Sequence, residues 1–541
     1  MQTISLILIL LLSVVVSGAV SRMLPLAIPR PLIQILIGGI VGLVADWKVE
    51  LDPEIFFLLF LPPLLFLDGW RIPRDEILKD KSTILELALG LVVFTVVGVG
   101  FFIDWLIPAM PLAVSFALAA VVSPTDPIAV SAIAQRVPIP KRMMHILEGE
   151  SLLNDASGLV CLRFAIAAAL TGTFSFQQAS LNFAWVSVGG VIVGAGVTWV
   201  ITRVKDWVSR KFGEESGSQI LISLLIPFAA YLIAEHLHCS GILAAVAAGV
   251  TMSITETSGS ALAVTRIRRN TVWDTIQFAG NGIIFVILGE QLPSILEGAR
   301  HTVLITGHNN PYWLAVYVVA INAALAISRF LWVWVSLKLT LFRTGRGGVT
   351  PPWRIVAAMA FAGVRGAITL AGILTLPLFT LDGLPFPARD LAIFLATGVI
   401  ILSLVAASVG LPILLKDLAM PVDSGADEAE NRVRIAAAEA AIDAIERLQH
   451  NLAEGRSDAD TYVSAASKLM EFYRQRISSR SEEKSFTSKS AELIERELRV
   501  AALRAERIEV LKQARRRTIG IETARKIVRE LDLAEARYGA S

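Results

Sequence analysis

Hydroxyl, amide and carboxylate side chains gather inside an apolar stretch near residue 150. In Leu147-Glu-Gly-Glu-Ser-Leu-Leu-Asn-Asp-Ala156, a helix would place Ser151 and Asp155 on one face, with Asn154 beside them. Their oxygens are hard ligands that suit a small hard cation and bind soft metals poorly. The single carboxyl of Asp155 can hold a proton or a cation but not both. The alternative is a capping cluster at a helix start, which suits the two preceding glutamates better because Asp155 lies deeper.

A second polar group lies at a predicted helix break, in Val122-Ser-Pro-Thr-Asp-Pro127. Pro124 and Pro127 each remove a backbone donor and clash with the preceding turn, which leaves carbonyl oxygens free. Thr125 and Asp126 would lie at that break, and unwound helices at the middle of the membrane form the ion sites of many secondary transporters. The alternative is a simple proline kink with a capping or snorkelling Asp126.

A third motif, Phe361-Ala-Gly-Val-Arg-Gly-Ala-Ile-Thr369, places an arginine among glycines. Gly363 and Gly366 loosen the helix and allow another backbone to come close. Arg365 stays charged and needs either an acidic partner or carbonyl oxygens, and we favour Glu150 as the partner. The leading interpretation of this pair is structural, because breaking a buried ion pair costs roughly 3–5 kcal/mol.

Four further polar residues give weaker signals. Asp68 follows Leu61-Pro-Pro-Leu-Leu-Phe66 and could capture cations at a cytoplasmic funnel, although a span-end residue in water is the more ordinary interpretation. Asn281 lies in an apolar segment, and Arg163 and Arg329 lie in spans without a partner that the sequence identifies.

Membrane helices must position these side chains, because 54% of the residues are hydrophobic and the mean hydropathy is +0.63. A span needs roughly 20 apolar residues, and shorter ones suffice inside a bundle. Thirteen segments qualify, at approximately 3–20, 31–46, 54–67, 83–107, 111–134, 146–171, 184–203, 218–236, 239–255, 272–296, 312–340, 352–380 and 389–415. The fold class is therefore an all-α polytopic membrane protein.

The basic residues predict the orientation of these spans. With the N-terminus outside, 20 basic residues fall in inner loops and three, Lys48, Arg300 and Arg389, fall in outer loops. This bias follows the positive-inside rule and places the C-terminus in the cytoplasm. The segment from Met1 to Val20 lacks a basic n-region, so we expect a retained first span rather than a signal peptide.

The composition changes near residue 422, which predicts two domains, 1–421 in the membrane and 422–541 outside it. The second carries 22 basic and 22 acidic residues, with helical periodicity over about 427–453, 458–478 and 486–538. An apolar stripe in this tail could pack within the domain, which we favour, against the membrane part, or against a second copy; it comprises Leu493, Ile494, Leu498, Ala501, Ala502, Ile508 and Leu511. The balanced charge argues against nucleic-acid binding, and Cys161 and Cys239 match no metal or disulfide spacing.

The three motifs, together with Pro62-Pro63 and Asp68, resemble the signatures of the monovalent cation:proton antiporter family, the bacterial relatives of animal sodium/proton exchangers. The likeness extends over the membrane part, and the tail resembles the regulatory tails of some members only loosely. It implies thirteen spans in two inverted repeats, with the fifth and twelfth broken and crossed, and a homodimer in the bacterial inner membrane that serves pH homeostasis without a cofactor.

The resemblance also implies residue roles. Asp155 would carry the ion and the proton, Asn154 would position it, and Thr125, Asp126 and Ser151 would belong to the site. The ligands of the alkali cation would be Asp155, Ser151 and Thr125. Glu150 and Arg365 would form the pair that holds the core helices together. Because a neutral Asn154 precedes Asp155, the match is to the electroneutral branch of the family.

Two other classes of function compete with exchange of Na⁺, K⁺ or Li⁺ for H⁺. An organic-anion carrier would want a cationic site, which Arg163, Arg329 and Arg365 could supply, but the acidic motifs argue against it. A membrane sensor would signal through its tail, yet residues 422–541 contain no kinase, cyclase or nucleotide motif. The chain has no P-loop, so ATP-driven transport is not supported. Ligand type alone does not distinguish sodium from potassium or lithium.

Overall fold

The computed structural model describes residues 2–539 apart from 24–27, 45–52, 72–80, 127–129, 131–140, 173–175, 257–262, 306–309, 311, 345–352, 417–423, 454–458, 482–485 and 517–520. The secondary structure of these residues is helical, with one isolated β-bridge between Phe379 and Pro385. The chain divides into two compact units, Met1–Leu418 and Ala419–Ser541.

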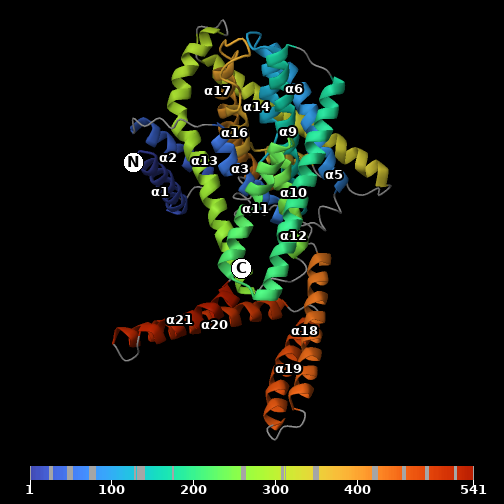
Figure 1. The fold of residues 1–541 in the computed structure, drawn as a ribbon, viewed down its shortest axis with the longest axis vertical. Coiled ribbons are helices and arrows are strands. Elements are labelled where there is room, and N and C mark those ends of the chain that lie inside the picture. Colours follow the sequence, from blue (N-terminus) through green and yellow to red (C-terminus); the bar gives the residue numbers. More distant parts are fainter. Residues whose placement is uncertain are drawn as a thin grey trace. The chain divides into compact units, whose positions relative to one another are not determined.

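The helices of the first unit follow the predicted apolar segments (Figure 1). They are α1 (Gln2–Met23), α2 (Arg30–Val44), α3 (Pro53–Arg71), α5 (Lys81–Leu85), the π-helix η1 (Glu86–Leu91), α6 (Val92–Leu106), α7 (Leu112–Val122), α9 (Lys141–Thr171), α10 (Phe176–Phe212), α11 (Ser216–His236), α12 (Gly241–Glu256), α13 (Ala263–Ile305), α14 (Tyr312–Thr344), α15 (Trp353–Phe361), α16 (Ala367–Leu374) and α17 (Arg389–Leu415).

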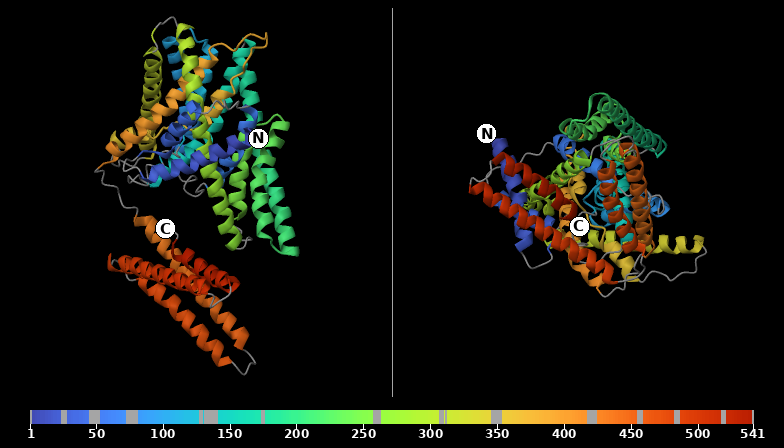
Figure 2. Two further views of the ribbon diagram at one scale, coloured as in Figure 1. Left: turned by 90° about the vertical axis from the view of Figure 1, so that its left-hand side faces the viewer. Right: turned by 90° about the horizontal axis from the view of Figure 1, so that it is seen from below.

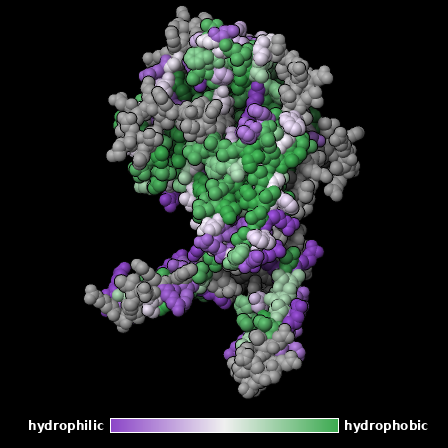
Figure 3. All heavy atoms as spheres, viewed as in Figure 1, coloured by the Kyte–Doolittle hydropathy of each residue, from purple (hydrophilic) through white to green (hydrophobic). Residues whose placement is uncertain are grey.

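Among the described residues, seven helices are long and apolar enough to cross a membrane, and four shorter helices are also apolar. Figure 3 shows the corresponding surface, where apolar side chains form a wide band over this unit. Large apolar residues of this unit, such as Trp185 and Ile192 of α10, are exposed, which is the pattern of a lipid-facing surface. The protein is therefore a multi-pass membrane protein, and the count of thirteen spans stays a prediction.

Glycines allow the helices that later form the site to pack closely. A Cβ atom at Gly249 of α12 would lie 2.1 Å from the carbonyl oxygen of Phe66 in α3, and one at Gly38 of α2 would lie 2.0 Å from that of Val286 in α13. Because backbones meet directly at these points, α3 and α13 are each held against a neighbour. Helices α10, α11 and α12 form a side-by-side group in the same unit (Figures 1 and 2).

Two helices are interrupted where prolines and glycines predicted breaks. Helix α7 ends at Val122, and residues 123–126 are not helical; α15 ends at Phe361, and residues 362–366 separate it from α16. The two unwound segments meet, because the backbone N–H of Asp126 donates to the carbonyl of Val364 at 2.7 Å. Pro127, the second proline of the first motif, lies outside the described residues.

The described residues of the second unit form four helices, α18 (Ser424–Ala453), α19 (Ala459–Ser481), α20 (Phe486–Arg515) and α21 (Ile521–Gly539). The helices pack as two pairs, α18 with α19 and α20 with α21 (Figure 2). The helical periodicity predicted over 486–538 is carried by two helices, α20 and α21. Helix α21 folds back on α20, where Arg504 of α20 pairs with Glu535 of α21 at 3.0 Å.

The members of the apolar stripe of α20 whose side chains the structure describes are exposed; they are Leu498, Ala501, Ala502, Ile508 and Leu511. Leu498 and Ile508 are each 66% exposed, whereas Val500, Leu503 and Val510, which lie outside the stripe, are half-buried. The expectation that the stripe packs inside the domain therefore does not hold for these five residues, because α21 lies against the neighbouring face of the helix, at Arg504 and Arg507.

Candidate cation-binding site

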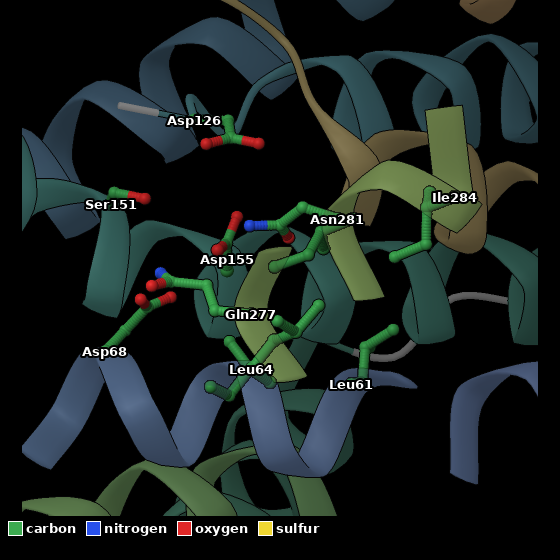
Figure 4. Close-up of a pocket in the computed structure, with 11 residues that line it drawn as sticks. Leu61, Leu64, Asp68, Asp126, Ser151, Asp155, Gln277, Asn281 and Ile284 are labelled. Atoms are coloured by element: carbon green, nitrogen blue, oxygen red, sulfur yellow. The ribbon is translucent and has the colours of Figure 1, made fainter. Parts of the chain in front are cut away.

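A small cavity with a free volume of about 50 Å³ lies where α3, α9, α13 and the break after α7 come together (Figure 4). This volume holds a few water molecules, or a small cation with part of its hydration shell. The cavity is lined by Leu61, Leu64, Leu65, Asp68, Asp126, Ser151, Asp155, Gln277, Asn281, Ile284 and Ile368.

Helix α9 supplies the two residues that the sequence placed on one face. Ser151 and Asp155 are both buried and both line the cavity, as their spacing of four predicts. Asp126 enters from the break after α7. Its carboxylate lies against Gly366 at the start of α16, where an added Cβ would come within 1.7 Å of Asp126 Oδ2. Only glycine fits at position 366, so the second break makes room for the carboxylate of the first.

Asp68 of α3 lines the same cavity and is solvent-exposed. The sequence suggested a residue at a cytoplasmic funnel or a span end in water, and the structure places Asp68 with Asp126 and Asp155 around one space. Of the described residues, those that line the cavity include no basic side chain. Carboxylates gathered in this way repel one another when ionised, which favours uptake of a proton or a cation.

Thr125 and Asn154 form a contact beside the cavity rather than lining it, as far as the described residues show. The amide Nδ2 of Asn154 donates to Thr125 Oγ1 at 3.0 Å, and the Thr125 hydroxyl donates to Glu150 Oε1 at 3.3 Å. This contact fastens the break after α7 to α9. The Thr125 oxygen accepts one hydrogen bond here and keeps a second lone pair, so these two bonds by themselves do not prevent it from binding a cation.

The partner of Glu150 is Arg329 of α14, so the expected pair of Glu150 with Arg365 is wrong. Arg329 Nη1 lies 2.5 Å from Glu150 Oε1, and Nη2 lies 2.7 Å from Oε2, which is a bidentate pair. Glu150 is 1% exposed and Arg329 is 2% exposed. Arg329 Nε also donates to the carbonyl of Met359 at 2.9 Å, which ties α9 and α14 to α15.

Arg365 is instead held by carbonyl oxygens, the second possibility that its chemistry left open. Its Nε donates to the carbonyl of Val122 at 2.8 Å, and its Nη1 donates to the carbonyl of Gly363. Its backbone N–H donates to Ser403 Oγ of α17 at 3.1 Å. Because helix breaks leave carbonyls without intrahelical donors, the guanidinium finds partners there and joins the two broken helices.

Some residues of this region were missed or left without a role by sequence reasoning. Gln277 gave no signal, and Asn281 was noted only as a polar residue in an apolar segment; both lie on α13 and line the cavity. Arg329 could have been considered as a partner for Glu150 from the sequence alone, because an arginine inside a span requires a partner. Arg163 pairs with Glu235 of α11 at 3.0 Å, on a partly exposed surface.

Comparison with known proteins identifies the family of the chain. The family model described as "Sodium/hydrogen exchanger, transmembrane" matches residues 8–417, and an uncharacterized Na⁺/H⁺ exchanger of Escherichia coli K12, YjcE, is 43% identical over 98% of both chains. The chain belongs to the sodium/hydrogen exchanger family. This exchanger is also 41% identical to a sodium, potassium, lithium and rubidium/H⁺ antiporter of Bacillus pumilus, over 87% of this chain and 69% of that one.

The fold of this exchanger also resembles a solved structure. The sodium proton antiporter MjNhaP1 from Methanocaldococcus jannaschii aligns with a TM-score of 0.61 at 19% identity, over 77% of this chain and 99% of that chain. The resemblance to monovalent cation:proton antiporters that the motifs indicated is thereby confirmed at the level of the family.

Proposed function

We propose that this exchanger is a secondary antiporter that moves an alkali cation, Na⁺, K⁺ or Li⁺, in one direction and H⁺ in the other. The observation that carries the proposal is the cavity in which Asp155 and Ser151 of α9 meet Asp126 and Asp68. A carboxyl in a space of this size binds a cation or a proton in turn, and this competition couples the two flows. The antiporter from Bacillus pumilus, named for four alkali cations, supports the substrate class.

The positions of three arginines in the membrane unit weigh against an organic-anion carrier. Arg329 is neutralised by Glu150, Arg163 pairs with Glu235, and Arg365 donates to carbonyls. None of the three lines the cavity formed by the described residues. An anion in that space would meet three carboxylates, which repel it.

Within this proposal, Asp155 is the carrier, Asn154 positions the break through Thr125, and Ser151 is the neutral ligand. Exchange is electroneutral: Asp155 releases its proton only when a cation replaces it, so the site has the same charge in both crossings. Asp126 stays ionised and offsets the partial positive charge of helix N-termini at the breaks. Alternating access then carries the loaded site across the membrane.

The surrounding architecture completes the proposal. Each protomer has thirteen spans in two inverted repeats, with its N-terminus outside. Two protomers form a homodimer in the lipid of the inner membrane. Residues 422–541 form a cytoplasmic helical domain that regulates exchange, and the physiological role is pH homeostasis. The charge bias of the loops supports the orientation, and the polar composition of the tail supports its place outside the membrane.

Purified protein in liposomes with an internal pH dye tests the exchange directly. Each alkali cation is added outside in turn, and a cation-driven change in internal pH is expected for wild type. Asp155→Asn keeps the size of the side chain but removes its exchangeable charge, so the variant should fold and show no exchange. Asp390→Asn, an exposed aspartate at the start of α17, is the matched control and should exchange normally. Near-normal exchange by Asp155→Asn would remove Asp155 from the mechanism.

A further inference from the structure

Asn281 of α13 brings an unused oxygen to the cavity from outside the two broken helices. Its Oδ1 atom is buried, and no described residue donates a hydrogen bond to it. Figure 4 shows the side chain reaching toward Asp155. A buried amide oxygen without a donor is unfavourable unless something else in the cavity satisfies it, and a cation or its water does so.

The neighbouring amide of the same helix is already occupied. Gln277 lines the cavity one turn earlier, but its Oε1 accepts a hydrogen bond from Arg71 Nη1 of α3 at 2.8 Å. Arg71 also forms an ion pair with Asp274 of α13. Asp274, Gln277 and Asn281 lie at spacings of three and four, so they share one face of the helix. Arg71 therefore positions this face of α13, and among the described residues the oxygen of Asn281 is left without a donor.

We infer that Asn281 is a cation ligand that sets the apparent affinity and the preference among alkali cations. This inference rests on the proposed antiport. The terminal torsion of asparagine is broad and roughly two-fold, so the amide can turn its nitrogen to the ionised Asp155 and its oxygen to a bound cation. A neutral amide carries no exchangeable proton. Asn281 consequently affects cation binding without changing the number of protons exchanged per cation.

Two nearly isosteric substitutions separate a ligand from a packing residue. Asn281→Leu keeps the volume and removes the oxygen, and Asn281→Asp keeps an oxygen and adds charge. Loss of one oxygen ligand should raise the apparent KM for the cation about tenfold, alter the ranking of Na⁺, K⁺ and Li⁺, and leave the maximal rate within about twofold. Asn281→Asp should lower KM at alkaline pH, where the added carboxyl is ionised.

Asn322→Leu is the matched control, because this half-buried asparagine of α14 donates to the carbonyl of Val399 and lies away from the cavity. It should lower the thermal stability without changing KM or the cation ranking. The inference is overturned if Asn281→Leu has the same apparent KM and the same ranking of alkali cations as wild type. If Asn281→Leu does not fold, an unchanged KM in Asn281→Asp overturns it equally. Wild-type protein without exchange refutes the antiport itself, which is a separate result.

Discussion

The buried pair of Glu150 and Arg329 should be the most sensitive contact in the membrane unit. Arg329→Leu would leave the carboxylate of Glu150, which is 1% exposed, without its cationic partner. Breaking one side of a buried pair costs about 3–5 kcal/mol, because the remaining charge stays desolvated. The carbonyl of Met359 also loses its donor, Arg329 Nε, at a cost of about 1 kcal/mol. Together these losses destabilise the protein by about 4–6 kcal/mol.

A double-mutant cycle tests this reasoning. Glu150→Gln leaves Arg329 unpaired and should be damaging by itself, but the double variant Glu150→Gln/Arg329→Leu leaves neither charge. Its loss should be smaller than the sum of the single losses by about 1–3 kcal/mol. Thermal unfolding of the purified protein in detergent, followed by size-exclusion chromatography, measures the four stabilities.

The cycle of Glu150→Gln with Arg365→Leu is the control. Arg365 donates to the carbonyls of Val122 and Gly363, so its loss should add to that of Glu150 with much weaker coupling. Additive losses for Glu150 and Arg329, combined with strong coupling between Glu150 and Arg365, would refute the pairing seen in the structure.

Three further outcomes follow from the same geometry. Gly366→Ala would place a Cβ 1.7 Å from Asp126 Oδ2, so exchange in liposomes should fall at least about tenfold. The control Gly98→Ala changes a position with open space around it and should stay active. Equal activities of the two variants would show that Asp126 can move freely. A chain ending at residue 421 should retain exchange with a changed apparent cation affinity or pH dependence, measured with the internal pH dye, and a folded but inactive truncation would make the tail part of the transport machinery. One cation for one proton predicts no sustained current on a solid-supported membrane; a cation-induced current that responds to imposed potential, in active protein, would contradict the electroneutral scheme.

Local features of the sequence determined the membrane character and the places where helices break. Prolines remove donors from a helix and glycines lower its stability, so the interruptions after Val122 and Phe361 could be predicted without knowing any neighbour. The shared face of Ser151 and Asp155 follows from helical spacing alone. The family also follows from these motifs, because they keep their order along the chain.

Tertiary structure decided which distant side chains meet. Glu150 pairs with Arg329, 179 residues away, although Arg365 lies in the more conspicuous motif. Asp68 and Asn281 join Asp155 at one cavity because α3 and α13 pack there. Spacing within one helix fixes which residues share a face, but the choice between several buried arginines depends on which helix approaches and on whether free carbonyls already satisfy one of them. That choice is made by packing between helices, which no local pattern of the sequence encodes.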